Sequence, residues 1–111
     1  MTFNEYQKEA FRTERGMNKE MPRVLNGALG LCGEAGEFAD LLKKHYFQGH
    51  PLDREHLAKE LGDILWYVAI AADTIGYDLE TVAKMNVHKL QARYPNGFEA
   101  EKSLNRAAGD V

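Results

Sequence analysis

Two pairs of acidic residues have a spacing that suits a metal site on a helix. Glu34 and Glu37 form the first pair, and Glu60 and Asp63 form the second. Residues three positions apart share one face of an α-helix, so each pair can offer two carboxylate oxygens to a hard cation such as Mg²⁺. The spacing alone is weak, because 17 acidic residues among 111 positions produce roughly 2.5 such pairs by chance.

The surroundings of the two pairs carry more weight than their spacing. In a helical projection Glu34 lies inside the apolar stripe of its segment, between Leu41 and Phe38, and Glu37 borders that stripe. The second pair lines one edge of the apolar face of the next segment. Packing of the two apolar stripes therefore brings the carboxylates to one seam, where unpaired burial costs several kcal/mol each. A metal ion, basic partners or exposure at the edge of the seam all fit this pattern.

Three polar residues further along the chain suit a phosphate ligand. Asn86, Lys89 and Arg93 repeat at helical spacing and lie along one face. A solvated charged face is the more common explanation of such a row. Tyr67 lies on the acidic edge and could stack on a nucleobase, whereas Trp66 points away and indicates contact with another helix or chain.

Glycine recurs at every third position in the segment that carries the first acidic pair. The four residues are Gly27, Gly30, Gly33 and Gly36. Each costs roughly 0.5–1 kcal/mol relative to alanine inside a helix. Close contact between helices is the favoured interpretation, and space for a ligand beside the carboxylates is the alternative.

The elements that position these residues are all predicted to be helices. Capping and breaking residues give four helices, which run from Thr2 to near Gly16, from Arg23 to about Tyr46, from Asp53 to about Ile75, and from Asp78 to Pro95. No segment alternates with a period of two, so we expect no strand. The predicted fold is all-α, with a short N-terminal helix and three longer antiparallel helices. Residues 1–98 form the predicted domain and residues 99–111 a polar tail.

Composition excludes several classes of protein. A formal charge of −3 argues against binding to a nucleic-acid polymer. Cys32 cannot form an internal disulfide and is expected to be a small core residue. No signal peptide and no long apolar segment are visible, so we expect a cytoplasmic protein that does not bind membranes. The scattered histidines do not supply the paired Glu-x-x-His units of a di-iron bundle.

Three ordered stretches of the sequence resemble the MazG-like all-α nucleoside triphosphate pyrophosphohydrolases. They run from Ala28 to Asp40, from Lys59 to Tyr67, and from Asn86 to Pro95. The family pattern is Glu-x-x-Glu followed, after a gap of variable length, by Glu-x-x-Asp, and all four acidic positions match it. The resemblance extends over most of the chain, from about Glu5 to Phe98.

This resemblance implies a reaction and a metal site. The reaction is the Mg²⁺-dependent hydrolysis of (deoxy)nucleoside triphosphates to monophosphate and pyrophosphate, with a metal-activated water as nucleophile. The implied metal ligands and catalytic residues are Glu34, Glu37, Glu60 and Asp63. Mn²⁺ is the expected substitute for Mg²⁺.

The resemblance also implies substrate contacts and an assembly. Asn86 and Lys89 match positions that touch the nucleotide, and Arg93 and Tyr67 are carried over with them. Family members are usually dimers or tetramers, so we expect a homodimer or a homotetramer. The alternative is a non-catalytic helical oligomer, a scaffold or regulatory protein whose acidic pairs are surface charges.

Overall fold

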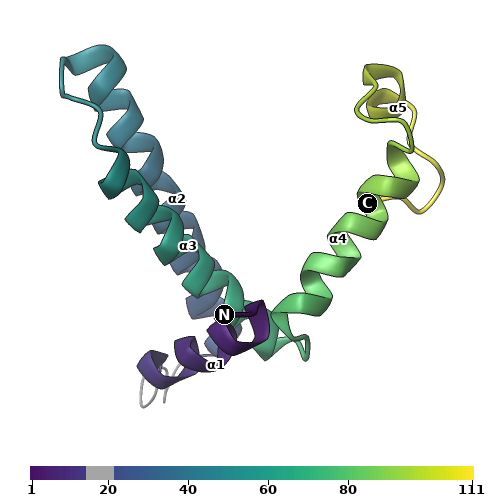
Figure 1. Cartoon of the computed structure of the whole chain (residues 1–111), viewed down its shortest axis with the longest axis horizontal. Helices are drawn as coiled ribbons and strands as arrows, with labels where there is room; N and C mark the ends of the chain where they lie inside the picture. The colour runs from purple at the N-terminus through teal and green to yellow at the C-terminus, as the bar shows by residue number, and fades with distance from the viewer. Residues whose placement is uncertain (15–21) are drawn as a thin grey trace. The chain divides into compact units, whose positions relative to one another are not determined.

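The computed structural model describes residues 1–14 and 22–111, and within them the chain forms five helices and no strand (Figure 1). The helices are α1 (Phe3–Glu14), α2 (Arg23–Gln48), α3 (Arg54–Thr74), α4 (Leu79–Arg93) and α5 (Ala100–Leu104). The all-α prediction is therefore confirmed. The predicted end of the first helix near Gly16 lies outside the described residues. No described helix is both long and apolar enough to traverse a bilayer.

Local capping interactions mark the beginnings of α1 and α3 and the end of α2. The backbone N–H of Thr2 donates to the Glu5 carboxylate and the N–H of Glu5 donates to the Thr2 hydroxyl, both at 3.1 Å. The Asp53 carboxylate accepts from the N–H of His56 at 3.0 Å and begins α3. Gly49 follows the last residue of α2 with a φ of 74°, a left-handed conformation that glycine adopts without strain.

The described chain divides into two compact units, residues 1–79 and 80–111. In the first unit α2 and α3 form a hairpin and lie side by side, and α1 packs on α3 (Figure 1). The small buried core consists of Ala10, Ala69, Ile70 and Leu79. The second unit contains α4 after its first residue, α5 and the C-terminal segment. The predicted packing of the fourth helix on the other long helices and the predicted domain end at residue 98 stay predictions.

Polar contacts fasten α1 to the end of α3. The buried Gln7 amide donates to the carbonyl oxygens of Ala69 at 3.0 Å and Tyr77 at 3.3 Å. The amide oxygen of Gln7 accepts from the N–H of Leu79 at 3.0 Å. The Leu79 N–H is buried at the first residue of α4, where no partner within that helix is available, so the Gln7 side chain satisfies this donor.

An ion-pair group joins the beginning of α2 to α1 and α3. The Arg23 guanidinium donates two hydrogen bonds to Glu14, at 2.7 and 2.9 Å, and one to Asp73 at 2.9 Å. Glu14 is buried, so its charge needs this partner. The group links the first residue of α2 to the last turn of α3.

The glycine row of α2 has two kinds of surroundings. A Cβ atom on Gly27 would lie tightly against α3, and one on Gly30 would overlap the Tyr67 ring. A Cβ atom on Gly33 or Gly36 would meet no described atom within 4 Å. Close contact between helices therefore explains the first two glycines, and open space lies beside the other two.

We expect alanine to have opposite effects at Gly30 and Gly33. Gly30→Ala forces the Tyr67 ring to move and should lower the free energy of unfolding by about 1–3 kcal/mol. Gly33→Ala, the matched control on the same helix, should raise it by about 0.5–1 kcal/mol through helix propensity. Urea unfolding followed by circular dichroism measures both. Equal effects of the two substitutions would contradict the packing of Gly30 on Tyr67.

Candidate metal centre

The α2–α3 hairpin brings carboxylates from both acidic pairs together. One oxygen atom from each of Glu34, Glu37 and Glu60 can be chosen so that all three lie within 4.8 Å of one another. Glu60 is buried, Glu34 is partly buried and Glu37 is exposed, which agrees with their predicted places within and beside the apolar stripe. Exposed acidic groups are common without a metal, so the cluster needs further support.

That support comes from two buried oxygens. With both groups ionised, Oε2 of Glu34 and Oε2 of Glu60 are buried and have no hydrogen-bond partner within the described residues. An unsatisfied buried acceptor costs about 1–3 kcal/mol, and more when it is charged. Ligation of a hard divalent cation would satisfy both oxygens, and a donor set made only of carboxylate oxygens suits Mg²⁺. The residues present therefore fit such an ion.

The surroundings of Glu34 raise its pKa to about 7. The main cause is a hydrogen bond with the Glu60 carboxylate, which is possible only when the Glu34 carboxyl is protonated. Desolvation and the charges of Glu37 and Asp63 act in the same direction. Without a cation the cluster therefore retains a proton at pH values where an ordinary glutamate is fully ionised.

Asp63, the fourth predicted ligand, lies on the wall of an adjoining cavity of about 350 Å³. It is not among the three residues that meet within 4.8 Å. Glu34 lines the same cavity, and the Asp63 charge contributes to the raised pKa of Glu34. Asp63 is thus a neighbour of the cluster and faces the space where a ligand could lie.

Aromatic residues form the rest of this cavity wall. Tyr67 and Trp66 line it, with their rings edge to face and the ring centroids 4.9 Å apart. The indole N–H of Trp66 donates to the Thr13 hydroxyl at 2.7 Å, so α1 also contributes to the wall. The contact of Trp66 with another helix that the sequence indicates is present here. Tyr67 stands beside the carboxylates, as its sequence position predicts.

His56 belongs to this region and the sequence reasoning missed it. Its Nε2 atom lies 3.1 Å from Oε1 of Glu60, one turn further along α3. The imidazole thus holds one oxygen of Glu60 while Oε2 is left without a hydrogen-bond partner among the described residues. Histidine–carboxylate contacts of this kind orient metal ligands. The available signal was the four-residue spacing of His56 and Glu60 on a predicted helix.

The predicted substrate residues of α4 lie in the second unit. Asn86 and Lys89 are exposed, and Arg93 is partly buried. Lys89 and Arg93 line a pocket within that unit, and Arg93 pairs with Asp110. Their participation in one site with the carboxylates stays a prediction.

One smaller prediction was wrong. Cys32 is exposed and free rather than part of the core. It lies on α2 away from the apolar stripe, because its position on the helical projection is far from that of Glu34 and Leu41.

Comparison with known proteins places this all-helical chain in a class of nucleotide-hydrolysing domains. The sequence profile of the MazG nucleotide pyrophosphohydrolase domain matches residues 24–98, which include both acidic pairs and α4. The chain is also similar to the Gene 37 protein of Mycobacterium phage L5, with 41% identity over 82 residues, which cover 70% of this chain and 72% of the phage protein. No solved structure shows a significant match. The chain belongs to the MazG nucleotide pyrophosphohydrolase domain family.

Proposed function

We propose that this protein hydrolyses (deoxy)nucleoside triphosphates to nucleoside monophosphate and pyrophosphate with the help of Mg²⁺. The observation that carries the proposal is the cluster of Glu34, Glu37 and Glu60, with two buried oxygens that lack partners among the described residues. Membership of a nucleotide pyrophosphohydrolase family supports the choice of substrate class.

In this proposal the carboxylates bind the cation, and one of them accepts a proton. Glu34, Glu37 and Glu60 would hold the cation, and Asp63 would complete the ligand set from the cavity wall. When bound, the cation offsets the negative charge of the phosphate oxygens and lowers the pKa of a water molecule. One carboxylate of the cluster accepts the proton as water attacks the α-phosphorus, and pyrophosphate leaves.

Tyr67 and three polar residues of α4 bind the nucleotide in this proposal. Tyr67 offers an aromatic surface for the base at the edge of the 350 Å³ cavity. Asn86, Lys89 and Arg93, which the family resemblance assigns to the substrate, contact the phosphates and stabilise charge on the leaving group. Mn²⁺ is expected to replace Mg²⁺, since both prefer oxygen ligands.

We further propose that the protein assembles as a homodimer or homotetramer in the cytoplasm. Support comes from the small buried core and from large apolar side chains that are exposed on α2 and α4 of the single chain, among them Leu29, Phe47, Met85 and Val87. The free thiol of Cys32 fits a reducing compartment. Neither a nucleic-acid polymer nor a membrane is among the proposed partners.

The test is a panel of canonical and modified triphosphates incubated with Mg²⁺, with pyrophosphate, monophosphate and orthophosphate quantified separately. We expect pyrophosphate and monophosphate in equal amounts, and none of either when the cation is removed by a chelator. Orthophosphate as the first product would show that a different bond is cut. A non-catalytic scaffold would give no product from any triphosphate and no Mg²⁺-dependent rise in the melting temperature.

A further inference from the structure

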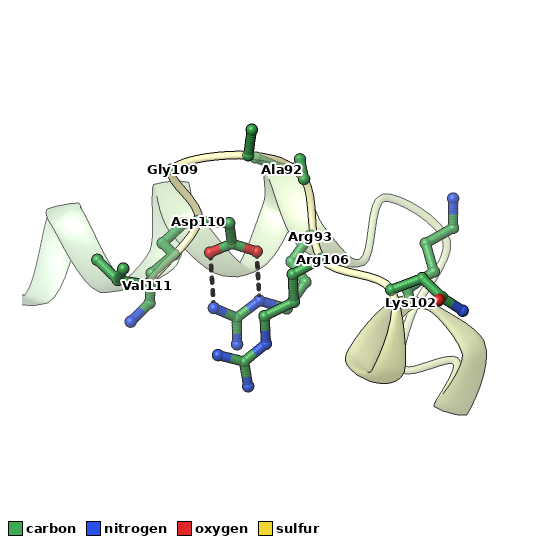
Figure 2. Close-up of a pocket in the computed structure, with 11 residues that line it drawn as sticks. Ala92, Arg93, Lys102, Arg106, Gly109, Asp110 and Val111 are labelled. Carbon is green, nitrogen blue, oxygen red and sulfur yellow. Dashed lines mark hydrogen bonds and ion pairs between the residues drawn. The ribbon is translucent and has the colours of Figure 1, made fainter.

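The second unit contains a pocket of about 480 Å³ between α4 and the C-terminal segment (Figure 2). Its lining includes four cationic side chains and one anionic side chain, which are Lys89, Arg93, Lys102, Arg106 and Asp110. A pocket with this excess of positive charge favours an anionic ligand, because its walls concentrate a field of one sign.

The Asp110 carboxylate accepts two hydrogen bonds from the Arg93 guanidinium, which is the arrangement of a bidentate anion complex. The Nε–H of Arg93 donates to Oδ2 of Asp110 at 2.7 Å, and its Nη2 group donates to Oδ1 at 2.6 Å (Figure 2). The Arg93 side chain is 10% exposed and that of Asp110 is 16% exposed, so water screens the pair little. Two parallel hydrogen bonds of this kind are also how a guanidinium binds two oxygens of a phosphate group.

Further cations act on the same carboxylate. The pKa of Asp110 is lowered first by its hydrogen bonds with Arg93, and the charges of Arg106 and Lys89 lower it further. Figure 2 shows the Arg106 side chain beside that of Arg93. One cation therefore pairs with Asp110 and two more line the same pocket, although a single carboxylate carries only one negative charge.

One wall of the pocket lies within the region that matches the family profile, and the other wall lies beyond it. Lys89 and Arg93 lie within residues 24–98, which match the family profile. Lys102, Arg106 and Asp110 lie beyond them. The wall that adds two cations and covers Arg93 is therefore outside the matched domain.

We propose that this pocket binds a phosphoanhydride, and that Asp110 occupies the place of one phosphate on Arg93 until the ligand displaces it. The choice of a phosphoanhydride rests on the proposed function, in which such a group enters with the triphosphate and leaves as pyrophosphate. Pyrophosphate carries several negative charges, so it pairs with more of the four cations than Asp110 can. The C-terminal segment thereby competes with the ligand for Arg93.

The experiment is calorimetric titration of the full chain with inorganic pyrophosphate, at low ionic strength and without a divalent cation. Asp110→Asn should bind pyrophosphate about tenfold more tightly, because the ligand no longer has to displace a charged competitor. Glu101→Gln is the matched control, since it removes the same charge from α5 outside the pocket lining; its affinity should change less than about twofold. Arg106→Gln should weaken binding by about threefold or more.

A second measurement detects whether pyrophosphate displaces Asp110 from Arg93. On addition of pyrophosphate the NMR signal of the Arg93 Nε–H should move in the unsubstituted protein, towards its position in the ligand-bound Asp110→Asn protein. Circular dichroism checks that all three variants keep their helices. If Asp110→Asn binds pyrophosphate with unchanged or lower affinity, Asp110 only fastens the C-terminal segment and the proposal is overturned.

The same titration shows whether the substrate or the product group is the ligand. Together with a hydrolysis assay, it also separates a failure of this proposal from a failure of the proposed function. Tighter binding of a triphosphate than of pyrophosphate would identify the substrate as the ligand, and equal binding would identify the product group; both support the proposal. If the unsubstituted protein binds pyrophosphate but hydrolyses no triphosphate, the proposed function is refuted and this pocket stands. Normal hydrolysis with no effect of Asp110→Asn on pyrophosphate affinity would refute the pocket alone.

Discussion

A Glu60→Gln protein is expected to lose triphosphate hydrolysis by about a thousandfold or more. Glu60 is the most buried carboxylate of the cluster, and its Oε2 has no hydrogen-bond partner among the described residues. The amide keeps the shape of the side chain and a partner for His56. It removes the negative charge and one anionic oxygen ligand, on which cation binding depends. Release of pyrophosphate in the presence of Mg²⁺ measures the loss.

Unfolding experiments separate this effect from a loss of structure. Without a cation, Glu60→Gln should melt no lower than the unsubstituted protein, because one of the mutually repelling charges is gone. It should also lose the Mg²⁺-dependent rise in melting temperature. Glu55→Gln is the matched control, since Glu55 lies on the same helix, is 82% exposed and pairs only at the surface with Lys59. Full activity of Glu60→Gln, or equal losses in both variants, would refute the assignment of the metal site.

The parts of the fold that were predictable depend on short-range interactions. The Thr2–Glu5 capping box, the Asp53 cap and the left-handed Gly49 involve residues at most five positions apart, so the sequence displays them directly. The cluster was predictable for a related reason. Glu34 lies within an apolar stripe, and two packed stripes leave its carboxylate few other places to lie.

The features that were missed depend on which side chains meet after packing. Arg93 pairs with Asp110, 17 residues away and beyond a turn and a short helix. Nothing in the periodicity of α4 indicates that partner, so Arg93 was read from the sequence only as a phosphate contact or a solvated charge. Likewise, the glycine row is regular in sequence, but only Gly27 and Gly30 lie against α3, because a helix presents only one side to its neighbour.

The apparent affinity for Mg²⁺ is expected to rise with pH and to level off above pH 7. Because the pKa of Glu34 is raised to about 7, a cation that binds below this pH must displace the proton shared with Glu60. One displaced proton changes the affinity by up to about tenfold per pH unit, and because Glu34 is still half protonated at pH 7 the change between pH 5 and pH 7 is about fiftyfold. Calorimetric titration with Mg²⁺ at a series of pH values measures it.

The stability of the cation-free protein should depend on pH in the opposite direction. The pKa of Glu34 rises from 4.5 in the unfolded chain to about 7 in the folded one, so between these values the folded state binds more protons. Its contribution to the free energy of unfolding is therefore complete below pH 4.5 and is lost as pH rises through 7. Added Mg²⁺ offsets the repulsion, so the gap between melting curves with and without the cation should widen from pH 5 to pH 7.

Glu34→Gln is the matched variant for both measurements, because it removes the titrating group and leaves the other carboxylates in place. Any remaining Mg²⁺ affinity of this variant should vary far less over the same pH range. The comparison also tests the clustering itself, since the proton is retained only where carboxylates lie close enough to repel one another. An affinity that stays flat from pH 5 to pH 8 in the unsubstituted protein would mean that Glu34 and Glu60 are too far apart in solution to share a proton or to hold one ion.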